Sequence, residues 1–139
     1  MTTPTPTPTT TAAALVAQAK AHVENLDVDA FAREAERDDA VVVDLREPEE
    51  RSATGTIAGA IAIPRGMLEF RADPTSPYHD ERLSPDRRVL LHCASGGRSA
   101  LAARSLAELG YGSVAHLDGG MTAWVEAGRP VRNHVPPAY

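Results

Sequence analysis

Cysteine is almost missing from this chain of 139 residues: Cys93 stands alone, so no disulfide can form within the chain. The same scarcity excludes zinc sites that need two or more cysteines. No apolar run approaches the roughly 18 residues of a membrane-spanning helix. The start, Met1-Thr-Thr-Pro, has neither the basic residues nor the apolar stretch of a signal peptide. These absences favour a cytoplasmic protein without a membrane partner.

Lysine is equally scarce. Arginine supplies almost all of the 14 basic residues, which stand against 19 acidic ones and leave a net charge of −5. The arginines are spread along the sequence and form no basic cluster. Since a nucleic-acid-binding surface needs concentrated positive charge, we expect no nucleic-acid partner.

One domain is expected between two tails. Residues 1–11 alternate threonine with proline and hold no apolar side chain after Met1, so they predict a disordered tail. Residues 12–132 are long enough to bury a core without disulfides. Residues 133–139 form a C-terminal tail.

Strand-like and helix-like segments alternate from residue 12 onward. Short aliphatic and β-branched runs predict strands at 41–45, 60–63, 89–91 and 113–117. Apolar spacing and capping residues predict helices at 12–26, 29–37, 98–109 and 121–127, a helix start at 47–50, and one or two helical turns at 65–70. In the first helix the apolar stripe consists of Leu15, Ala19, Val23 and Leu26. The alternation predicts an α/β fold with a central, mostly parallel sheet flanked by helices on both faces.

Cys93 sits between the strand 89–91 and the helix 98–109. A thiol at such a turn faces the free N–H groups and the positive dipole end of the helix, which stabilise an anion. Asp44 also ends a strand and Asp118 follows one, so all three side chains belong to the rim where open α/β sheets bind ligands. We therefore expect Cys93 to be a reactive thiolate rather than a buried apolar residue.

The turn after Cys93, Ala94-Ser-Gly-Gly97, contains no large side chain, so successive N–H groups can point inward at an anion. Arg98 closes the turn with a fixed positive charge that suits oxyanions. We expect Ser99 to cap the helix rather than to react, because the sequence shows no base beside it.

Four motifs, in register, resemble those of a single-domain rhodanese. They are Val43-Asp44-Leu-Arg46-Glu47, then Gly59-Ala60 with Ile63-Pro64, then His92-Cys-Ala-Ser-Gly-Gly-Arg-Ser99, and finally His116-Leu-Asp-Gly119-Gly120-Met-Thr-Ala-Trp124 with Gly128-Arg-Pro130. The resemblance runs from about residue 27 to residue 131 and implies a rhodanese-like domain for 12–132. One departure is Gly55-Thr-Ile-Ala-Gly59-Ala60, where many members of the family read Gly-His-Ile-Pro-Gly-Ala.

The resemblance also implies roles and a reaction. Cys93 is the nucleophile that carries a sulfane sulfur, and Asp44 and Arg46 match a supporting pair, expected to form an ion pair or a hydrogen-bonded brace. The sulfur-binding residues are Ala94, Ser95, Gly96, Gly97, Arg98 and Ser99. Sulfur moves from thiosulfate or a related persulfide donor, small molecule or protein, to a thiol or cyanide acceptor through a Cys93 persulfide. No metal or other cofactor is required, and the acceptor comes from outside the chain because it has no second cysteine.

Two alternatives stay open, and the sequence makes no prediction of oligomeric state. Cysteine-based phosphatases and arsenate reductases share the thiolate, the turn and the arginine, but the motif that they resemble is Cys-x5-Arg, with five residues between the cysteine and the arginine. Four residues separate Cys93 from Arg98 here. The turn is therefore narrower, which favours binding of a single sulfur atom over a phosphoryl group. A rhodanese-like module that carries sulfur or binds a regulatory partner without turnover is the other alternative, although the presence of Cys93 argues for catalysis or sulfur carriage.

The segment 72–80 is dense in turn-forming residues and predicts a long loop before the strand 89–91. We hypothesise that residues 64–70 and 73–79 fold over the rim of the sheet, with Arg65 or His79 near the site. The alternative is an ordinary surface loop.

Overall fold

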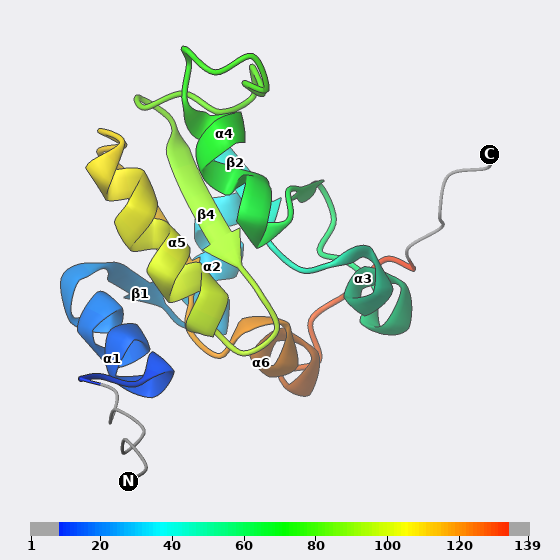
Figure 1. Cartoon of the computed structure of the whole chain (residues 1–139). Coiled ribbons are helices and arrows are strands. Elements are labelled where there is room, and N and C mark those ends of the chain that lie inside the picture. Colours follow the sequence, from blue (N-terminus) through cyan, green and yellow to red (C-terminus); the bar gives the residue numbers. More distant parts are fainter. Residues whose placement is uncertain (1–8, 134–139) are drawn as a thin grey trace, which may run out of the picture.

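A five-stranded parallel sheet with helices on both faces forms this protein (Figure 1). The computed structural model describes residues 9–133. The strands are β1 (Glu24–Leu26), β2 (Ala40–Asp44), β3 (Ile61–Ala62), β4 (Arg88–His92) and β5 (Val114–Leu117). The helices are α1 (Ala12–His22), α2 (Val28–Ala35), α3 (Pro48–Thr54), α4 (Leu68–Ala72), α5 (Gly97–Glu108) and α6 (Gly120–Glu126), with one 3-10 turn, η1 (Arg65–Met67). None of the helices in this described part is long and apolar enough to cross a membrane. The expected α/β class is confirmed.

Strand β4 lies at the centre of the sheet, whose order is β1-β5-β4-β2-β3. Leu91 of β4 lies opposite Val43 of β2 on one side and opposite His116 of β5 on the other. All of β4 is buried, and its apolar run Val89–Leu91 fits a strand that is covered on both faces. The carboxyl end of the central strand therefore meets the ends of β2 and β5 at one rim, where ligands of open α/β sheets bind.

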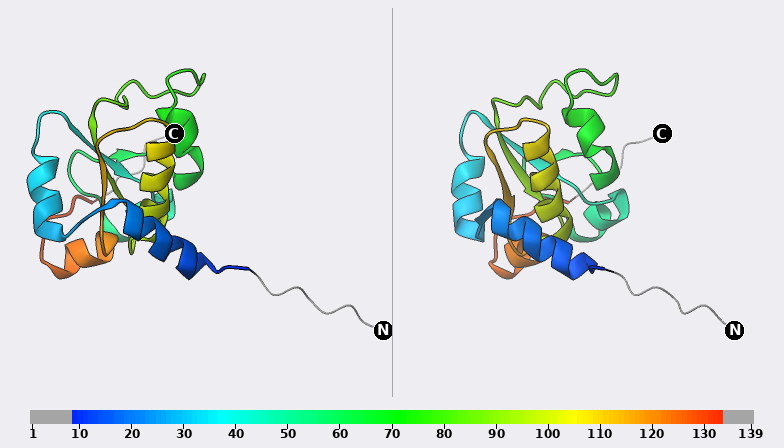
Figure 2. Two further views of the ribbon diagram at one scale, coloured as in Figure 1. Left: turned by 90° about the vertical axis from the view of Figure 1, so that its left-hand side faces the viewer. Right: turned by 60° about the vertical axis from the view of Figure 1, so that its left-hand side comes forward.

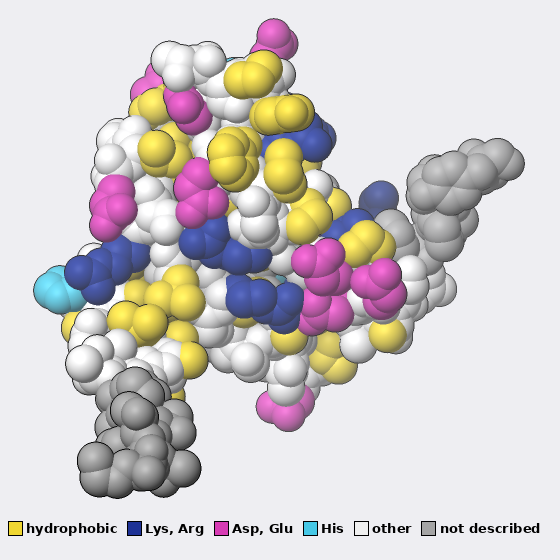
Figure 3. All heavy atoms as spheres, in the orientation of Figure 1, with side chains coloured by type: hydrophobic (Ala, Val, Ile, Leu, Met, Phe, Trp, Pro, Cys, Tyr) yellow, Lys and Arg dark blue, Asp and Glu magenta, His cyan; other side chains and the backbone are white. Residues whose placement is uncertain are grey.

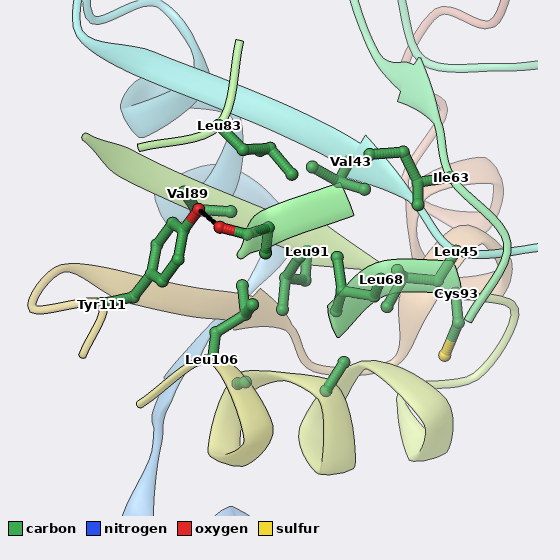
Figure 4. Close-up of a cluster of buried hydrophobic side chains, with 13 residues drawn as sticks. Val43, Leu45, Ile63, Leu68, Leu83, Val89, Leu91, Cys93, Leu106 and Tyr111 are labelled. Atoms are coloured by element: carbon green, nitrogen blue, oxygen red, sulfur yellow. Dashed lines mark hydrogen bonds between the residues drawn. The ribbon is translucent and has the colours of Figure 1, made fainter. Parts of the chain in front are cut away.

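The helices cover the two faces of the sheet in separate layers (Figure 2). On one face, α2 and α6 bury Phe31 and Trp124 against Leu90, and the two aromatic rings meet edge to face with centroids 6.2 Å apart. On the other face, α4 and α5 contribute Leu68 and Leu106 to a second cluster (Figure 4), and α1 lies against α5. Since both faces of β4 are packed, the residue that follows this strand has a rigid support.

The first helix is shorter than its apolar spacing predicts. α1 ends at His22, and Val23 has extended backbone, with φ −122° and ψ 164°. Leu15, expected on the buried stripe, is 44% exposed, whereas Leu26 is buried in β1, which pairs with β5. The hypothesis of one helix over 12–26 is wrong because pairing with the edge of the sheet gives the segment after α1 other backbone hydrogen bonds, and tertiary contacts override local spacing.

The two expected tails lie mostly outside the described residues, which exclude 1–8 and 134–139. At the end of the first tail, the Thr11 side chain caps α1 by accepting a backbone N–H at 3.0 Å. Near the start of the second, Thr56 and Arg132 exchange two backbone hydrogen bonds of 2.7 Å. Hydrogen bonds therefore hold the described chain in place near residue 11 and near residue 132.

Candidate active site

Cys93 directly follows the central strand β4 and lies at the carboxyl-end rim of the sheet. The residue is 1% exposed and belongs to the buried cluster that contains Leu45 and Leu68. Its sulfur atom, however, points away from these aliphatic side chains and toward the first turn of α5 (Figure 4). The thiol therefore has an apolar support on one side and the polar end of a helix on the other.

The turn after Cys93 directs donors at the sulfur. The Gly96 N–H donates to Sγ over 3.2 Å, in a residue with φ of +104°, which favours glycine. Ser99 Oγ lies 3.6 Å from Sγ. Burial raises the pKa of the Cys93 thiol, but the Ser99 side chain and the backbone N–H groups of Ser99, Gly96 and Ser95 together hold the pKa below its usual value. The geometry favours a thiolate, as the sequence predicts.

The start of α6 holds this turn in place. A Cβ on Gly120 would lie 2.5 Å from the Ala94 carbonyl oxygen, so only glycine fits. The Met121 N–H donates to the Cys93 carbonyl oxygen at 2.8 Å, and the Thr122 N–H donates to the Ala94 carbonyl oxygen at 3.0 Å. The free N–H groups of α6 therefore fix the backbone on which the thiol stands.

Arg98 closes the turn, but its charge is already paired. Its Nη1 and Nη2 bind the two carboxylate oxygens of Glu50 in α3 at 2.7 and 2.8 Å. The hydrogen bonds from Arg98 lower the pKa of Glu50 to about 2, so this carboxylate stays ionised. Figure 3 shows basic side chains over the start of α5 beside acidic side chains over α3. The one basic residue of the turn therefore faces a carboxylate before any substrate anion arrives.

Asp44 and Arg46 form the expected ion pair at the end of β2. Arg46 Nη2 and Nε bind the two carboxylate oxygens of Asp44 at 2.8 and 3.0 Å, and both side chains are buried. Burial raises the pKa of Asp44, but the hydrogen bonds from Arg46 together with the charges of His92 and Arg46 outweigh it, and the pKa lies below its usual value. Arg46 also donates to Thr54 Oγ1 and to the Gly55 carbonyl oxygen at 2.6 and 2.8 Å. The pair fastens β2 to α3, the helix that carries Glu50.

Ser99 does not cap α5, contrary to expectation. Gly96 occupies the cap position and Ser99 lies in the first turn of the helix, fully buried. Its hydroxyl points to the sheet, where His116 Nδ1 of β5 lies 2.8 Å away. The sequence predicts no role for His116, the first residue of the fourth motif, although it is an ionisable residue on a buried strand. The Ser99 hydroxyl thus lies between the Cys93 thiol and the His116 ring and contacts both.

A cavity of about 470 Å³ opens beside the turn, between α3 and α6. Apolar side chains form most of its wall, and three charged residues also line it. Its lining consists of Arg46, Glu50, Ala53, Thr54, Ala94, Met121, Thr122, Val125 and Glu126. The cavity has the size of a small-molecule site and shares Ala94 with the turn that holds Cys93.

The turn-rich loop 72–80 does not fold over Cys93, whereas Leu68 of α4 lies in the same buried cluster as Cys93. The loop leads into the amino end of β4, at the end of the sheet opposite the thiol (Figure 1). His79 Nε2 bonds within this loop to the Leu83 carbonyl oxygen at 2.9 Å, and Arg65 pairs with Glu69 at 2.9 Å. Local partners take up both side chains, and neither contact places Arg65 or His79 at Cys93, so a role for them at the site stays a prediction.

Asp118 lies at the rim, as expected, and its carboxylate binds Lys20 Nζ at 2.9 Å near the surface. Within residues 9–133, no three side chains of histidine, cysteine, aspartate or glutamate gather in a group that could hold a metal ion.

Comparison with known proteins connects this arrangement to one family. The family model described as "Rhodanese-like domain" matches residues 27–127. A relative from Allochromatium vinosum, named "Sulfurtransferase", is 34% identical over 110 residues, which cover 78% of this chain and 94% of the relative.

Two solved structures share the fold. The polysulfide-sulfur transferase homodimer of Wolinella succinogenes is 30% identical, with 91% of each chain covered and a TM-score of 0.69. A Rhodopseudomonas palustris protein of unknown function, called a "possible tyrosine phosphatase", is 37% identical, with 94% of this chain and 100% of that chain covered and a TM-score of 0.86. The names of these two similar proteins point to different reactions, sulfur transfer and phosphate ester cleavage.

Proposed function

This chain belongs to the rhodanese-like domain family, and we propose that it is a sulfurtransferase in which Cys93 receives and passes on a sulfane sulfur as a persulfide. The observation that carries the proposal is the position of Cys93 Sγ, which follows the central strand and accepts the Gly96 N–H at 3.2 Å. A turn of inward N–H groups that stabilises a thiolate also stabilises an anionic sulfur attached to it.

The proposed reaction consists of two displacements at sulfur. The Cys93 thiolate attacks the terminal sulfur of the donor, a new S–S bond forms, and the rest of the donor leaves with the electron pair, as sulfite from thiosulfate or as a thiolate from a persulfide. An acceptor thiolate or cyanide then attacks the outer sulfur of the Cys93 persulfide, and the Cys93 thiolate is the leaving group. Neither displacement uses a metal or another cofactor. The acceptor is a separate molecule because the chain holds one cysteine.

Free thiosulfate is the less favoured donor. Glu50 already binds both terminal nitrogens of Arg98, so a dianion must compete with a carboxylate that is held in place. A persulfide on a small thiol or on another protein brings less charge, and the largely apolar cavity between α3 and α6 offers room for it. The similar polysulfide-sulfur transferase supports a sulfur donor other than thiosulfate.

Phosphatase chemistry is the second candidate because of the name given to the similar Rhodopseudomonas palustris protein. Four residues separate Cys93 from Arg98, and Arg98 is paired with Glu50 at 2.7 Å. A tetrahedral phosphate needs a wider turn and a free guanidinium. The geometry therefore supports transfer of a single sulfur atom better.

Two measurements test the proposed function. After incubation with a persulfide donor, we expect Cys93 to gain the mass of one sulfur atom, and with thiosulfate and cyanide we expect thiocyanate to form, more slowly. Cys93→Ser should show neither. Phosphate release from an aryl phosphate without sulfur transfer would reverse the assignment in favour of a phosphatase. If Cys93 gained no sulfur and no product formed, the chain would be a binding module without turnover.

The expectations about location and partners stay predictions. They are a cytoplasmic location and the absence of nucleic-acid and membrane partners. The family match at 27–127 lies within the domain predicted for 12–132.

A further inference from the structure

A continuous chain of hydrogen bonds leads from Cys93 to the end of α1. Cys93 Sγ lies 3.6 Å from Ser99 Oγ, and Ser99 Oγ lies 2.8 Å from His116 Nδ1. His116 Nε2 in turn lies 2.7 Å from Asn25 Oδ1. Ser99 and His116 have no exposed surface, so bulk water does not compete for the middle of this chain.

The backbone near the end of α1 fixes the orientation of the Asn25 amide. Asn25 Nδ2 donates to the carbonyl oxygens of Lys20 and Val23 at 2.9 and 3.1 Å. Turning the amide over would set Oδ1 against these two carbonyl oxygens, and both contacts would become repulsive. Oδ1 therefore faces His116 as an acceptor, and His116 Nε2 must carry a hydrogen.

This Nε2–H determines what the other ring nitrogen of His116 can do. In the neutral imidazole Nδ1 is then an acceptor, and the Ser99 hydroxyl must donate to it. The hydroxyl has a single hydrogen, so it offers Cys93 a lone pair, which suits a thiol S–H. When Cys93 is a thiolate, the hydroxyl can donate to the sulfur only if Nδ1 gains a proton and becomes the donor.

We propose that His116 takes up the proton that Cys93 gives up, with Ser99 as the relay. The S–H proton passes to Ser99 Oγ while the hydroxyl proton passes to His116 Nδ1, so a thiol and an imidazole become a thiolate and an imidazolium. The proton stays on the imidazole while the cysteine carries the persulfide, and it returns through Ser99 once the acceptor has taken the sulfur. His116 touches neither donor nor acceptor and is a positioning residue. The inference rests on the proposed function, in which Cys93 is the nucleophile.

Charged groups surround His116 from three elements. Burial lowers the pKa of His116, Asp118 after β5 opposes this, and Lys20 of α1 adds to it. Lys20 and Asp118 bind each other at 2.9 Å, so their effects on the ring oppose one another. Cys93 is the group next to Ser99 whose charge changes during the reaction. The imidazolium is therefore stabilised chiefly when Cys93 is a thiolate, which couples the two titrations.

Two spectra on nearly unaltered protein test this coupling. Cys93 is the single cysteine, so ultraviolet thiolate absorbance follows its ionisation alone, and ring-nitrogen NMR follows His116. Linkage requires that each group shift the other equally. We expect Cys93→Ser to move the His116 titration down by about one pH unit, and His116→Gln to move the Cys93 titration up by the same amount, a tenfold change in equilibrium. A His116 titration that is the same in wild type and Cys93→Ser would overturn the relay, even if His116→Gln does not fold.

Alkylation of Cys93 by a small neutral reagent tests the role of Ser99. We expect Ser99→Ala and His116→Gln each to react about tenfold more slowly at mildly acidic pH and at the wild-type rate at alkaline pH, where the thiolate is complete. The double variant should be no slower, because residues of one relay are not additive. Ser105→Ala, in the same helix but bonded to Arg65, is the matched control and should react like wild type.

Additive losses, or an unchanged profile in Ser99→Ala, would refute the relay and leave the persulfide reaction standing. Normal coupling of Cys93 with His116 in a protein that never gains sulfur would refute the proposed function instead. The two failures are therefore distinguishable.

Discussion

At the scale of single residues, Glu50 decides how strongly the turn after Cys93 can attract an anion. Its carboxylate binds both ends of the Arg98 guanidinium, and replacing it by a neutral amide of the same shape frees one positive charge. We expect Glu50→Gln to lower the KM for thiosulfate about three- to tenfold, with an effect that shrinks as salt is added. The measurement is initial-rate kinetics at two ionic strengths.

Glu49→Gln is the matched control for this change, because Glu49 lies in the same helix and is exposed. It should leave the KM for thiosulfate as in wild type. A Glu50→Gln protein with an unchanged KM and a reduced kcat would show that Glu50 braces the turn and does not select the donor.

At the scale of elements, the contact between α6 and the turn after Cys93 depends on Gly120. Alanine there would bring a Cβ within 2.5 Å of the Ala94 carbonyl oxygen at a φ of +59°. We expect Gly120→Ala to lose about 1–3 kcal/mol of unfolding free energy, from strain and a displaced turn. We also expect at least about a tenfold loss in sulfur loading of Cys93, since small displacements of a nucleophile are costly.

Gly128→Ala tests whether these losses come from the turn. Gly128 follows the same helix at φ +73°, and a Cβ added there would meet nothing within 4 Å. It should lose only about 1 kcal/mol from its left-handed backbone and load sulfur normally. Equal loading of Cys93 in the Gly120 and Gly128 variants would contradict the proposed role of α6.

At the scale of the whole molecule, two buried histidines make stability depend on pH. Burial lowers the pKa of His92 and of His116 from the ordinary 6.5. As the pH falls below about 6.5, the unfolded chain binds protons that the native protein does not, so the native state loses stability. Each histidine contributes at most about 1.4 kcal/mol per pH unit. Urea unfolding at about pH 7.5 and 5.5 should show this decline.

His92→Gln should flatten the decline between those pH values, whereas His22→Gln, at the exposed end of α1, should not. A second decline belongs to carboxylates bound by arginine. Hydrogen bonds lower the pKa of Glu50 from 4.5 and of Asp80 from 3.8, each to about 2. Their contribution is present above the unfolded values and disappears as the pH falls toward 2. A flat stability from neutral to acidic pH would contradict both assignments.

Local patterns account for most of the fold and for part of the candidate site. The β-branched run of β2 and the apolar run of β4 predict strands, and both lie inside the observed sheet. β1 and the end of α1 are missed, because the spacing of Val23 and Leu26 suits a helix until the edge of β5 becomes available for pairing. The turn chemistry around Cys93 is local, and so it is predictable.

The sequence by itself determined the parallel α/β class and the place of Cys93 between a strand and a helix, because both depend on residues close together in the chain, whereas the resemblance to the family supplied the pairing of Asp44 with Arg46. Only the tertiary structure decided that Glu50 pairs with Arg98, 48 positions away, and that Ser99 meets His116, 17 positions away. Neither contact leaves a local pattern, since each arises when separate elements converge on the carboxyl ends of the strands. The pairing of the Arg98 charge and the histidine bonded to Ser99 are therefore properties of the folded sheet rather than of the motif.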